Sequence, residues 1–363
     1  MLRLFKMAES VTKKACTSPL IGTHNGHFHA DEALAVYLLR LLPTYSQSPL
    51  IRTRDPALLQ TCHTVVDVGG EYDAPNNRYD HHQRTFATTF PGYTTKLSSA
   101  GLVYMHFGQS IVAQHLSLPI EHAHVGIIYN KLYADFIEAI DANDNGIAAY
   151  DSDALKAAGV EKKFKDGAIT IPSIVGDMNK PGSEEEESLD EDGLFNNASK
   201  FIGSVFSRKL RAAAGSWLPA RETVGQAYES RKSGVHPSGK IMVLPQGGVP
   251  WKEHLYNFEK GAKEAGEAEG ESEVYFVLYP ESADEASKWR IQAVSVNESS
   301  FISRRPLPEQ WRGVRDADLD GVIAGETAEP KIPAGAVFVH ASGFIGGHKT
   351  REGAYAMAIR ALQ

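Results

Sequence analysis

Apolar and polar positions follow two alternating patterns along the first 140 residues of the chain. Short apolar or β-branched runs alternate with longer stretches in which apolar side chains recur at helical spacing. The runs at 19–22, 50–54 and 64–68 predict strands, and the stretches at 31–42, 98–107 and 125–140 predict helices. This alternation is typical of an α/β fold with a parallel or mostly parallel sheet.

The pattern changes near residue 233. Residues 195–230 have helical periodicity, residues 233–239 are rich in turn formers, and a strand is predicted at 240–244. Further strands are predicted at 273–278, 290–296 and 336–340. We therefore expect two α/β domains, with the active site in the cleft between them. The larger domain would span residues 18–232 and a smaller one residues 238–363.

Composition narrows the possible functions. A chain of 363 residues with 42% hydrophobic residues can bury two cores, and a net charge of −8 argues against a wholly basic nucleic-acid-binding surface. An acidic run at 182–192 is expected to be a solvated insertion. Two cysteines, Cys16 and Cys62, allow neither a disulfide framework nor a cysteine zinc site. No apolar window of about twenty residues predicts a membrane span.

Residues 1–17 are basic and rich in hydroxyl and apolar side chains, with a single acidic residue, Glu9. This composition is typical both of an organelle transit peptide and of a disordered tail.

Candidate chemistry begins in the sequence GTHNGHFHADE, residues 22–32. It contains His24, His27 and His29, followed by Asp31 at the predicted start of a helix. A His-x-His pair also opens the metal site of many barrel hydrolases. This stretch alone therefore does not show whether the histidines form a barrel-hydrolase site, another metal site or structural hydrogen bonds.

A second stretch, Asp80-His81-His82, favours a metal site, because consecutive histidines after an aspartate fit poorly into an apolar core. Adjacent side chains point in opposite directions from an extended backbone, so one histidine can bind metal while the other faces substrate. Asp67 and Asp141 supply carboxylates after apolar runs. Such mixed ligands suit Mn²⁺, Zn²⁺ or Fe²⁺ better than Mg²⁺, and a pair of metals needs a bridging carboxylate.

Four blocks of sequence carry a family resemblance: HNGxFHxDEALA, VVDVGG, YDHHQ and AIDANDNG. They resemble the N-terminal motifs of the DHH phosphoesterase superfamily, in the variant found in the melanocyte-proliferating-gene family of eukaryotic 3′→5′ exoribonucleases. Residues 340–353 resemble the C-terminal signature of that family. The first block differs from the commoner superfamily pattern, because a histidine, His29, stands where the first aspartate would be.

The resemblance implies two divalent metal ions, preferably Mn²⁺ with Mg²⁺ as the alternative. It also implies His82 as a catalytic residue facing the phosphate and Asp80 as the residue that orients an imidazole. Asp67 would bridge the ions, Asp144 is the rival of Asp141, and His27 would be a bystander. The metal ligands implied are His24, His29 and Asp67 for one ion, and Asp31, Asp67, His81 and Asp141 for the other.

Two C-terminal stretches are candidate substrate contacts. Around His348, glycine N–H groups and nearby cations could capture phosphate, although a tight turn explains the same residues. The residues concerned are Gly346, Gly347, His348, Lys349 and Arg351. Arg304 and Arg305, with Trp311, could grip a single strand by charge and stacking, although a solvated loop is the competing interpretation.

The first functional hypothesis is a 3′→5′ exoribonuclease that cleaves single-stranded RNA or short oligonucleotides with a hydroxide activated by two metals. The second is a small-molecule phosphohydrolase, such as a pyrophosphatase or a short-oligonucleotide hydrolase. A barrel hydrolase of amide or amine bonds and a non-catalytic nucleic-acid-binding protein are the other candidates. The resemblance suggests a location in the nucleus, cytoplasm or mitochondrion.

Overall fold

The computed structural model describes residues 18–165, 167–268 and 270–363. The expected transit peptide or tail, with Cys16, lies outside the described residues. The chain divides into two compact units, the first ending at Arg211 and the second beginning at Ala212. Each unit is described by itself below.

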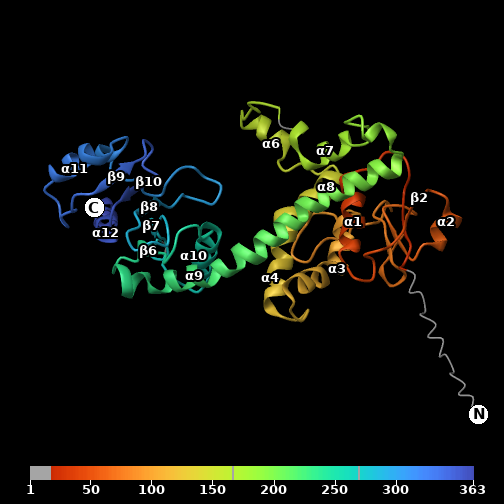
Figure 1. Ribbon diagram of the computed structural model, residues 1–363, viewed down its shortest axis with the longest axis horizontal. Helices are drawn as coiled ribbons and strands as arrows, with labels where there is room; N and C mark the ends of the chain where they lie inside the picture. The colour runs from red at the N-terminus through yellow and green to blue at the C-terminus, as the bar shows by residue number, and fades with distance from the viewer. Residues whose placement is uncertain (1–17, 166, 269) are drawn as a thin grey trace, which may run out of the picture. The chain divides into compact units, whose positions relative to one another are not determined.

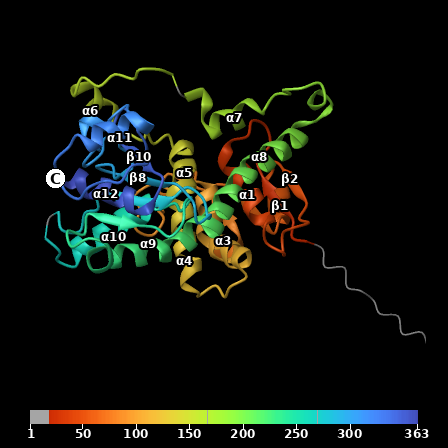
Figure 2. The same cartoon turned by 60° about the vertical axis from the view of Figure 1, so that its left-hand side comes forward.

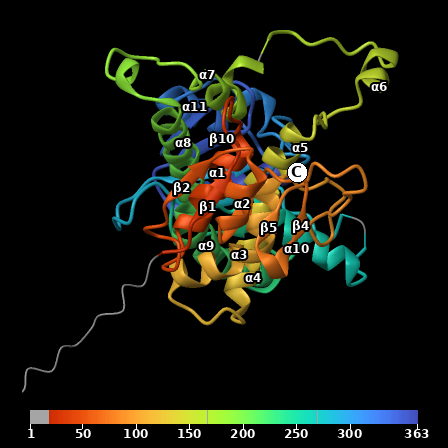
Figure 3. The ribbon, with the colours of Figure 1, turned by 90° about the vertical axis from the view of Figure 1, so that its right-hand side faces the viewer.

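A five-stranded, mostly parallel sheet forms the centre of the first unit (Figure 3). The strand order is β2-β1-β3-β5-β4, in which only β4 runs antiparallel to its neighbour. Its strands are β1 (Ile21–Thr23), β2 (Leu50–Arg52), β3 (Thr64–Val66), β4 (Tyr72–Asp73) and β5 (Arg78–Tyr79). The predicted mostly parallel α/β sheet is therefore confirmed. Strands β4 and β5 were not predicted, since two-residue strands have no recognisable period.

Helix α1 (Ala30–Arg40) packs against α3 (Ser99–Leu116) beside this sheet, and nine of the eleven residues of α1 are buried. Helix α2 (Pro56–Thr61) contributes Leu59 to a small cluster with Cys62 and Val65. Because the first turn of α1 is buried, its acidic residues Asp31 and Glu32 are carried into the interior. The remaining elements up to the acidic run are η1 (Ala74–Asn76), α4 (Ala123–Leu132), the π-helix η2 (Tyr133–Ile137), α5 (Glu138–Asp144), α6 (Ser152–Ala157), η3 (Gly167–Ile169) and α7 (Ile171–Asp177).

The boundary between the units falls inside a long helical run rather than near residue 233 (Figure 1). The run consists of α8 (Glu191–Ala212), the π-helix η5 (Ala213–Trp217), α9 (Leu218–Ser230) and the π-helix η6 (Arg231–Val235). Phe206 of α8 packs near Tyr104 in the first unit, whereas Val224 of α9 belongs to a core of the second unit. Helical periodicity does not reveal which core a helix faces. The predicted boundary was therefore put at the next turn-rich stretch, residues 233–239.

A mixed five-stranded sheet with the order β6-β7-β8-β10-β9 forms the centre of the second unit (Figure 1). Two of its strands, β8 and β10, pack against helix α12, which is labelled near them in Figure 2. Only β6 and β7 are parallel. Successive strand residues alternate between two cores: Phe276 packs with residues of α11 and α12, and Val277 packs with residues of α9 and α10. The elements are β6 (Ile241–Val243), α10 (Lys252–Glu264), β7 (Phe276–Pro280), β8 (Trp289–Ala293), η7 (Glu309–Trp311), α11 (Asp316–Ala324), β9 (Ala336–Val339), β10 (Ile345–His348) and α12 (Arg351–Leu362).

None of the helices that the structure describes is both long enough and apolar enough to cross a bilayer.

The packing of α8 against α1 gives a stability prediction. A side chain added at Gly203 would overlap the ring of Tyr37, which is itself held by a hydrogen bond between Tyr37 Oη and Ser207 Oγ at 3.0 Å. We expect Gly203→Ala to lower the free energy of unfolding by about 1–3 kcal/mol, measured by urea denaturation. Gly126→Ala is the control, because no atom other than the neighbouring backbone of helix α4 lies within 4 Å of the added carbon. An unchanged stability of Gly203→Ala would contradict this account of the packing.

Candidate metal centre

The predicted site residues of the first unit gather at the carboxyl ends of three parallel strands. His24 follows β1, Asp67 follows β3, and Asp80 with the two histidines follows β5. Neighbouring parallel strands present these ends at one edge of the sheet, where ligands of α/β proteins commonly bind. The sequence motifs converge because the strand order places β1, β3 and β5 side by side.

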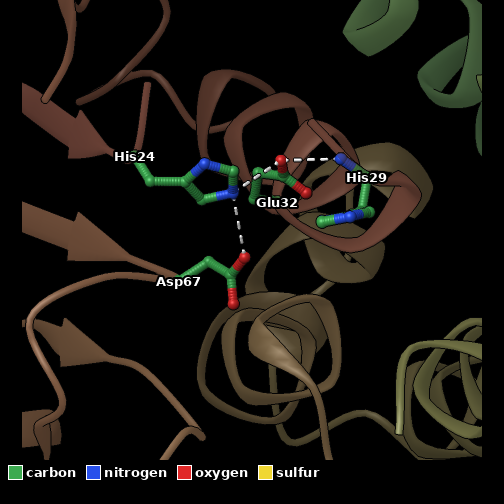
Figure 4. Close-up of side chains that lie close together, drawn as sticks. All are labelled: His24, His29, Glu32 and Asp67. Atoms are coloured by element: carbon green, nitrogen blue, oxygen red, sulfur yellow. Dashed lines mark hydrogen bonds and ion pairs between the residues drawn. The ribbon is translucent and has the colours of Figure 1, made fainter. Parts of the chain in front are cut away.

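One group of ligand atoms surrounds His24 (Figure 4). His24 Nε2 lies 3.0 Å from Glu32 Oε1 and 3.4 Å from Asp67 Oδ2. The backbone N–H of His29 donates to Glu32 Oε1 at 2.8 Å. His24, His29, Glu32 and Asp67 each offer a ligand atom within 4.8 Å of the others. Glu32 was not predicted, although it stands next to Asp31 in the first turn of the same helix.

A second set of ligand atoms lies on the other side of Asp67. His81 Nε2 is 3.2 Å from Asp67 Oδ1 and 3.0 Å from Asp144 Oδ2. Asp67, His81 and His82 form one candidate ligand group, and His29, Asp31 and Asp144 form another. The two carboxylate oxygens of Asp67 therefore face different imidazoles, which is the geometry that a bridging ligand needs.

The backbone of Asp67 is held in an unusual conformation. Its φ of 58° lies in the left-handed region that non-glycine residues rarely adopt. The hydroxyl of Ser99, at the start of α3, donates to Asp67 Oδ1 at 3.0 Å. Such strain persists only where the surroundings hold the residue in place, and here it turns the carboxylate out of the strand and into the cluster.

The residues fit a bound divalent cation. Asp31 is completely buried, and neither of its carboxylate oxygens has a hydrogen-bond donor among the described residues. Burial raises the pKa of Asp31 well above its usual range, and the charges of Asp67, Asp144 and Glu32 raise it further. Buried carboxylates without donors are costly, and a divalent ion would neutralise several of them at once. The mixture of imidazole and carboxylate suits a transition metal such as Mn²⁺.

The histidines compensate part of this negative charge. Burial lowers the pKa of His24, but its hydrogen bonds to Asp67 and Glu32 outweigh this effect and raise the pKa to about 10. In His81, burial again opposes the carboxylates of Asp144 and Asp67, which raise the pKa to about 9. Burial raises the pKa of Asp67, but hydrogen bonds with His24 and His81 bring it below its usual range. A metal that binds these imidazoles must displace their protons.

Asp141 does not lie in the ligand cluster, and this corrects the preference for Asp141 over Asp144. Its carboxylate is completely buried at the N-terminus of α3. Asp141 Oδ1 accepts hydrogen bonds from Ser98 N at 3.0 Å, Ser98 Oγ at 2.8 Å and Gly101 N at 3.0 Å. Burial raises its pKa to about 7 against these donors. Asp144, three residues further along α5, is the carboxylate that reaches His81.

Asp80 holds His82 in the manner expected of an orienting carboxylate. Asp80 Oδ1 lies 2.7 Å from His82 Nδ1, and Asp80 Oδ2 accepts the N–H of Gly70 at 2.6 Å. The hydrogen bond to Asp80 is the largest cause of the raised pKa of His82. The His82 side chain is 61% exposed, whereas that of His81 is 5% exposed. The two histidines therefore differ in exposure, but their ring centres lie only 4.5 Å apart, so the opposite directions expected of an extended backbone are not observed.

The cluster opens into a pocket of about 450 Å³. Lys96, Asn145 and Pro172 contribute to its wall and were not predicted, because none of them belongs to a recognisable motif. Lys96 brings a cation to the wall of this pocket, with its Nζ 5.5 Å from the ring centre of Phe86. His27 is exposed, belongs to no candidate ligand group among the described residues, and stacks edge-on against His29 at 5.4 Å.

The structure places the predicted glycine-rich phosphate site inside a sheet. Gly346 and Gly347 belong to β10, which pairs with β8 on one side and β9 on the other. His348 is completely buried, with Nε2 3.0 Å from Pro333 O and Nδ1 accepting the N–H of Thr350 at 3.0 Å. These three residues therefore have structural contacts in place of the open anion-binding turn that was expected. Lys349 and Arg351 are exposed.

Arg304 and Trp311 also differ from their expected roles. Arg304 makes a paired interaction with the buried Glu259, with Nη1 to Oε1 at 2.8 Å and Nη2 to Oε2 at 2.7 Å. Trp311 is completely buried, and its indole N–H donates to Glu326 at 2.7 Å, so its ring is not available to stack on a base. Arg305 is partly exposed, and its Nε donates to Ala361 O at 2.7 Å. The sequence could not reveal these partners, which are far away along the chain.

The fold and the site together define an α/β protein with a mixed imidazole and carboxylate centre suited to divalent metal. Comparison with known families gives a match over residues 20–362 to MYG1_exonuc, described as an uncharacterised protein family (UPF0160). The chain belongs to this family, which confirms the family resemblance of the sequence.

Relatives extend over nearly the whole chain. A human protein named MYG1 exonuclease is 46% identical over 351 residues, covering 95% of this chain and 86% of the relative. A MYG1 protein of Saccharomyces cerevisiae is 42% identical over 358 residues, covering 98% of both. A crystal structure of exonuclease RecJ bound to manganese aligns with 95% of this chain and 89% of that one, at 14% identity and a TM-score of 0.25.

The positions of Asp144 and Asp141 give opposite mutational predictions. We expect Asp144→Asn to weaken Mn²⁺ binding at least about 10-fold, measured by calorimetry, because it removes a carboxylate from the cluster. We expect Asp141→Asn to lower the free energy of unfolding by about 1–3 kcal/mol, because the amide nitrogen that replaces Oδ2 cannot accept the hydrogen bond of the buried Tyr133 hydroxyl. The reverse pattern, with metal loss confined to Asp141→Asn, would restore Asp141 as the ligand.

The ion pair between Arg304 and Glu259 gives a prediction for the second unit. Arg304→Gln leaves a buried carboxylate without its cation, so we expect the free energy of unfolding to fall by about 3 kcal/mol in urea denaturation. Arg305→Gln is the control, because Arg305 has no carboxylate partner among the described residues and should have a smaller effect. If Arg304→Gln kept full stability and instead lost affinity for RNA, the phosphate-contact interpretation would stand.

Proposed function

We propose that the chain is a metal-dependent exonuclease that shortens single-stranded RNA from its 3′ end. The observation that supports this proposal best is the centre around Asp67, in which two sets of ligand atoms share one carboxylate. Membership of the family, with close relatives named as exonucleases, supports the reaction class. The polarity, the RNA substrate and the choice of Mn²⁺ come from the resemblance of the motifs.

In this proposal His24, His29, Glu32 and Asp67 hold one ion, and Asp31, Asp67, His81 and Asp144 hold the other. Bound there, two divalent ions would activate water and offset the charge on the phosphoryl group under attack. The largely exposed His82 faces the phosphate, and Asp80 fixes its ring through Nδ1. Lys96 lines the same pocket and supplies positive charge for a phosphate oxygen.

A second candidate is hydrolysis of a small phosphorylated molecule or short oligonucleotide. It is favoured by one observation: Arg304 and Trp311, the expected contacts to a polymer, are engaged in internal contacts.

A different surface of the second unit could bind a polymer in the first candidate function. The second unit has a pocket of about 480 Å³ whose lining includes the partly exposed rings of Trp217 and Tyr279, together with the amide of Gln292. Aromatic rings and amides are the groups that proteins use to stack on and bind unpaired bases.

The test is digestion of a 5′-labelled single-stranded RNA with Mn²⁺ by the wild-type protein and by Asp67→Asn. We expect the wild type to produce a ladder that shortens from the 3′ end, and the variant to lose at least about 100-fold in rate, since both ligand groups lose a charged member. Asp135→Asn is the matched control, because that carboxylate pairs with Lys131 on the surface.

Two outcomes would change the assignment. Intact RNA with consumption of pyrophosphate or dinucleotides would leave the metal centre in place and favour the second candidate. Full activity of Asp67→Asn at saturating Mn²⁺ would refute the bridging role.

A further inference from the structure

The loop that carries the histidines, residues 24–29, is held by a segment 150 residues further along the chain. Besides β1 and α1, the loop is contacted by Arg52, Arg54 and Asp67. Its most distant partners along the sequence lie in residues 176–195, which include the acidic run expected to be a solvated insertion. These contacts occur at the two ends of the acidic run.

The first contact is a side-chain clamp by Asn179. Asn179 Oδ1 accepts the N–H of Phe28 at 2.8 Å, and Asn179 Nδ2 donates to Phe28 O at 2.9 Å. The same Nδ2 also donates to Gly176 O at 3.1 Å, which ties the amide to α7. One amide therefore satisfies both backbone groups of the residue before His29. Only an amide side chain offers a donor and an acceptor in this arrangement.

The second contact is made at the start of α8. Glu191 Oε2 accepts the N–H of Gly26 at 3.3 Å, and Arg52 Nη2 donates to Gly26 O at 2.6 Å. Arg52 Nη1 in turn donates to Glu191 O at 3.1 Å. The Arg52 guanidinium lies 5.6 Å from the ring centre of Phe28, so the same cation supports the loop at two residues.

The stretch between these contacts has no such role. Residues 181–190 are exposed apart from the half-buried Glu186, and Glu186 bonds only to Gly182 and Asn197, which lie outside the loop. The charges of residues 181–190 can therefore be removed without removing the contacts at the two ends of the acidic run.

We propose that Asn179 is a positioning residue for the metal centre, which fixes the backbone of Phe28 so that His29 and His24 present their rings to the same ion. The inference rests on the metal-dependent function proposed above. His29 is itself exposed, so little packing holds its ring, and the position of its backbone determines where the ring can go. Groups that orient metal ligands commonly contribute 10–100-fold to metal affinity.

The test measures Mn²⁺ binding to the full-length protein by calorimetry, for the wild type, Asn179→Ala and Asn197→Ala. We expect Asn179→Ala to bind Mn²⁺ about 10-fold more weakly, with activity restored at saturating Mn²⁺ and an unchanged kcat. Amide hydrogen exchange should become faster across residues 24–29 and stay unchanged in the rest of the sheet. Asn197→Ala is the matched control, because its amide bonds to Glu186 within the acidic segment. A triple replacement of Glu184, Glu185 and Glu187 by Gln should also leave the affinity unchanged.

The outcomes separate the two proposals. If the wild type binds no Mn²⁺ and no other divalent transition metal, the proposed function fails and the clamp has no metal centre to position. If the wild type binds Mn²⁺ and folded Asn179→Ala binds it equally well, only the positioning role fails. A loss of affinity of the same size in Asn197→Ala would show a general loosening of the segment and would also overturn it.

Discussion

The concentration of carboxylates at one edge of the first sheet is the constraint on which the surrounding structure depends. Asp31 is buried beside Asp67, Asp144 and Glu32, and their mutual repulsion must be offset within the fold. The protein offsets it with imidazoles at His24 and His81, each within hydrogen-bonding distance of a carboxylate. Neighbouring elements keep the groups in place: Asp141 caps α3, and α3 in turn supplies the hydroxyl that binds Asp67. The same few residues at helix ends therefore contribute both to the stability of the first unit and to the candidate metal centre.

Much of the first unit could be predicted from sequence because its signals are local. The strands β1, β2 and β3 coincide with apolar runs, and a residue after a strand in a parallel sheet must lie at the ligand-binding edge, which located His24 and Asp67. His81 follows the unpredicted strand β5 and was found through its Asp-His-His stretch. Asp141 and Asp144 could not be distinguished in this way. Both lie on one short helix, and the choice depends on how α5 is rotated against α3, which is decided by packing.

The second unit shows where local signals mislead. The pair Gly346-Gly347 looks like a turn, yet it forms the middle of strand β10, where an added side chain would meet Arg290 or Leu307. Arg304 looks like a surface cation, but its partner Glu259 is 45 residues away in the sequence. Trp311 looks exposed beside arginines, but its ring fills the core under α11 and α12. In each case the deciding contact is long-range, and a single sequence contains no direct record of such contacts.

The distribution of tryptophan between the units has a practical consequence. All four tryptophans of the chain, Trp217, Trp251, Trp289 and Trp311, lie beyond the boundary at Ala212, and the metal centre lies before it. Indole emission is therefore an intrinsic optical label of the second unit alone, and the first unit is spectroscopically silent in that band. A melting curve followed by tryptophan emission and one followed by far-ultraviolet circular dichroism would report different parts of the chain. Their divergence on adding Mn²⁺ would reveal whether the two halves unfold as one cooperative unit.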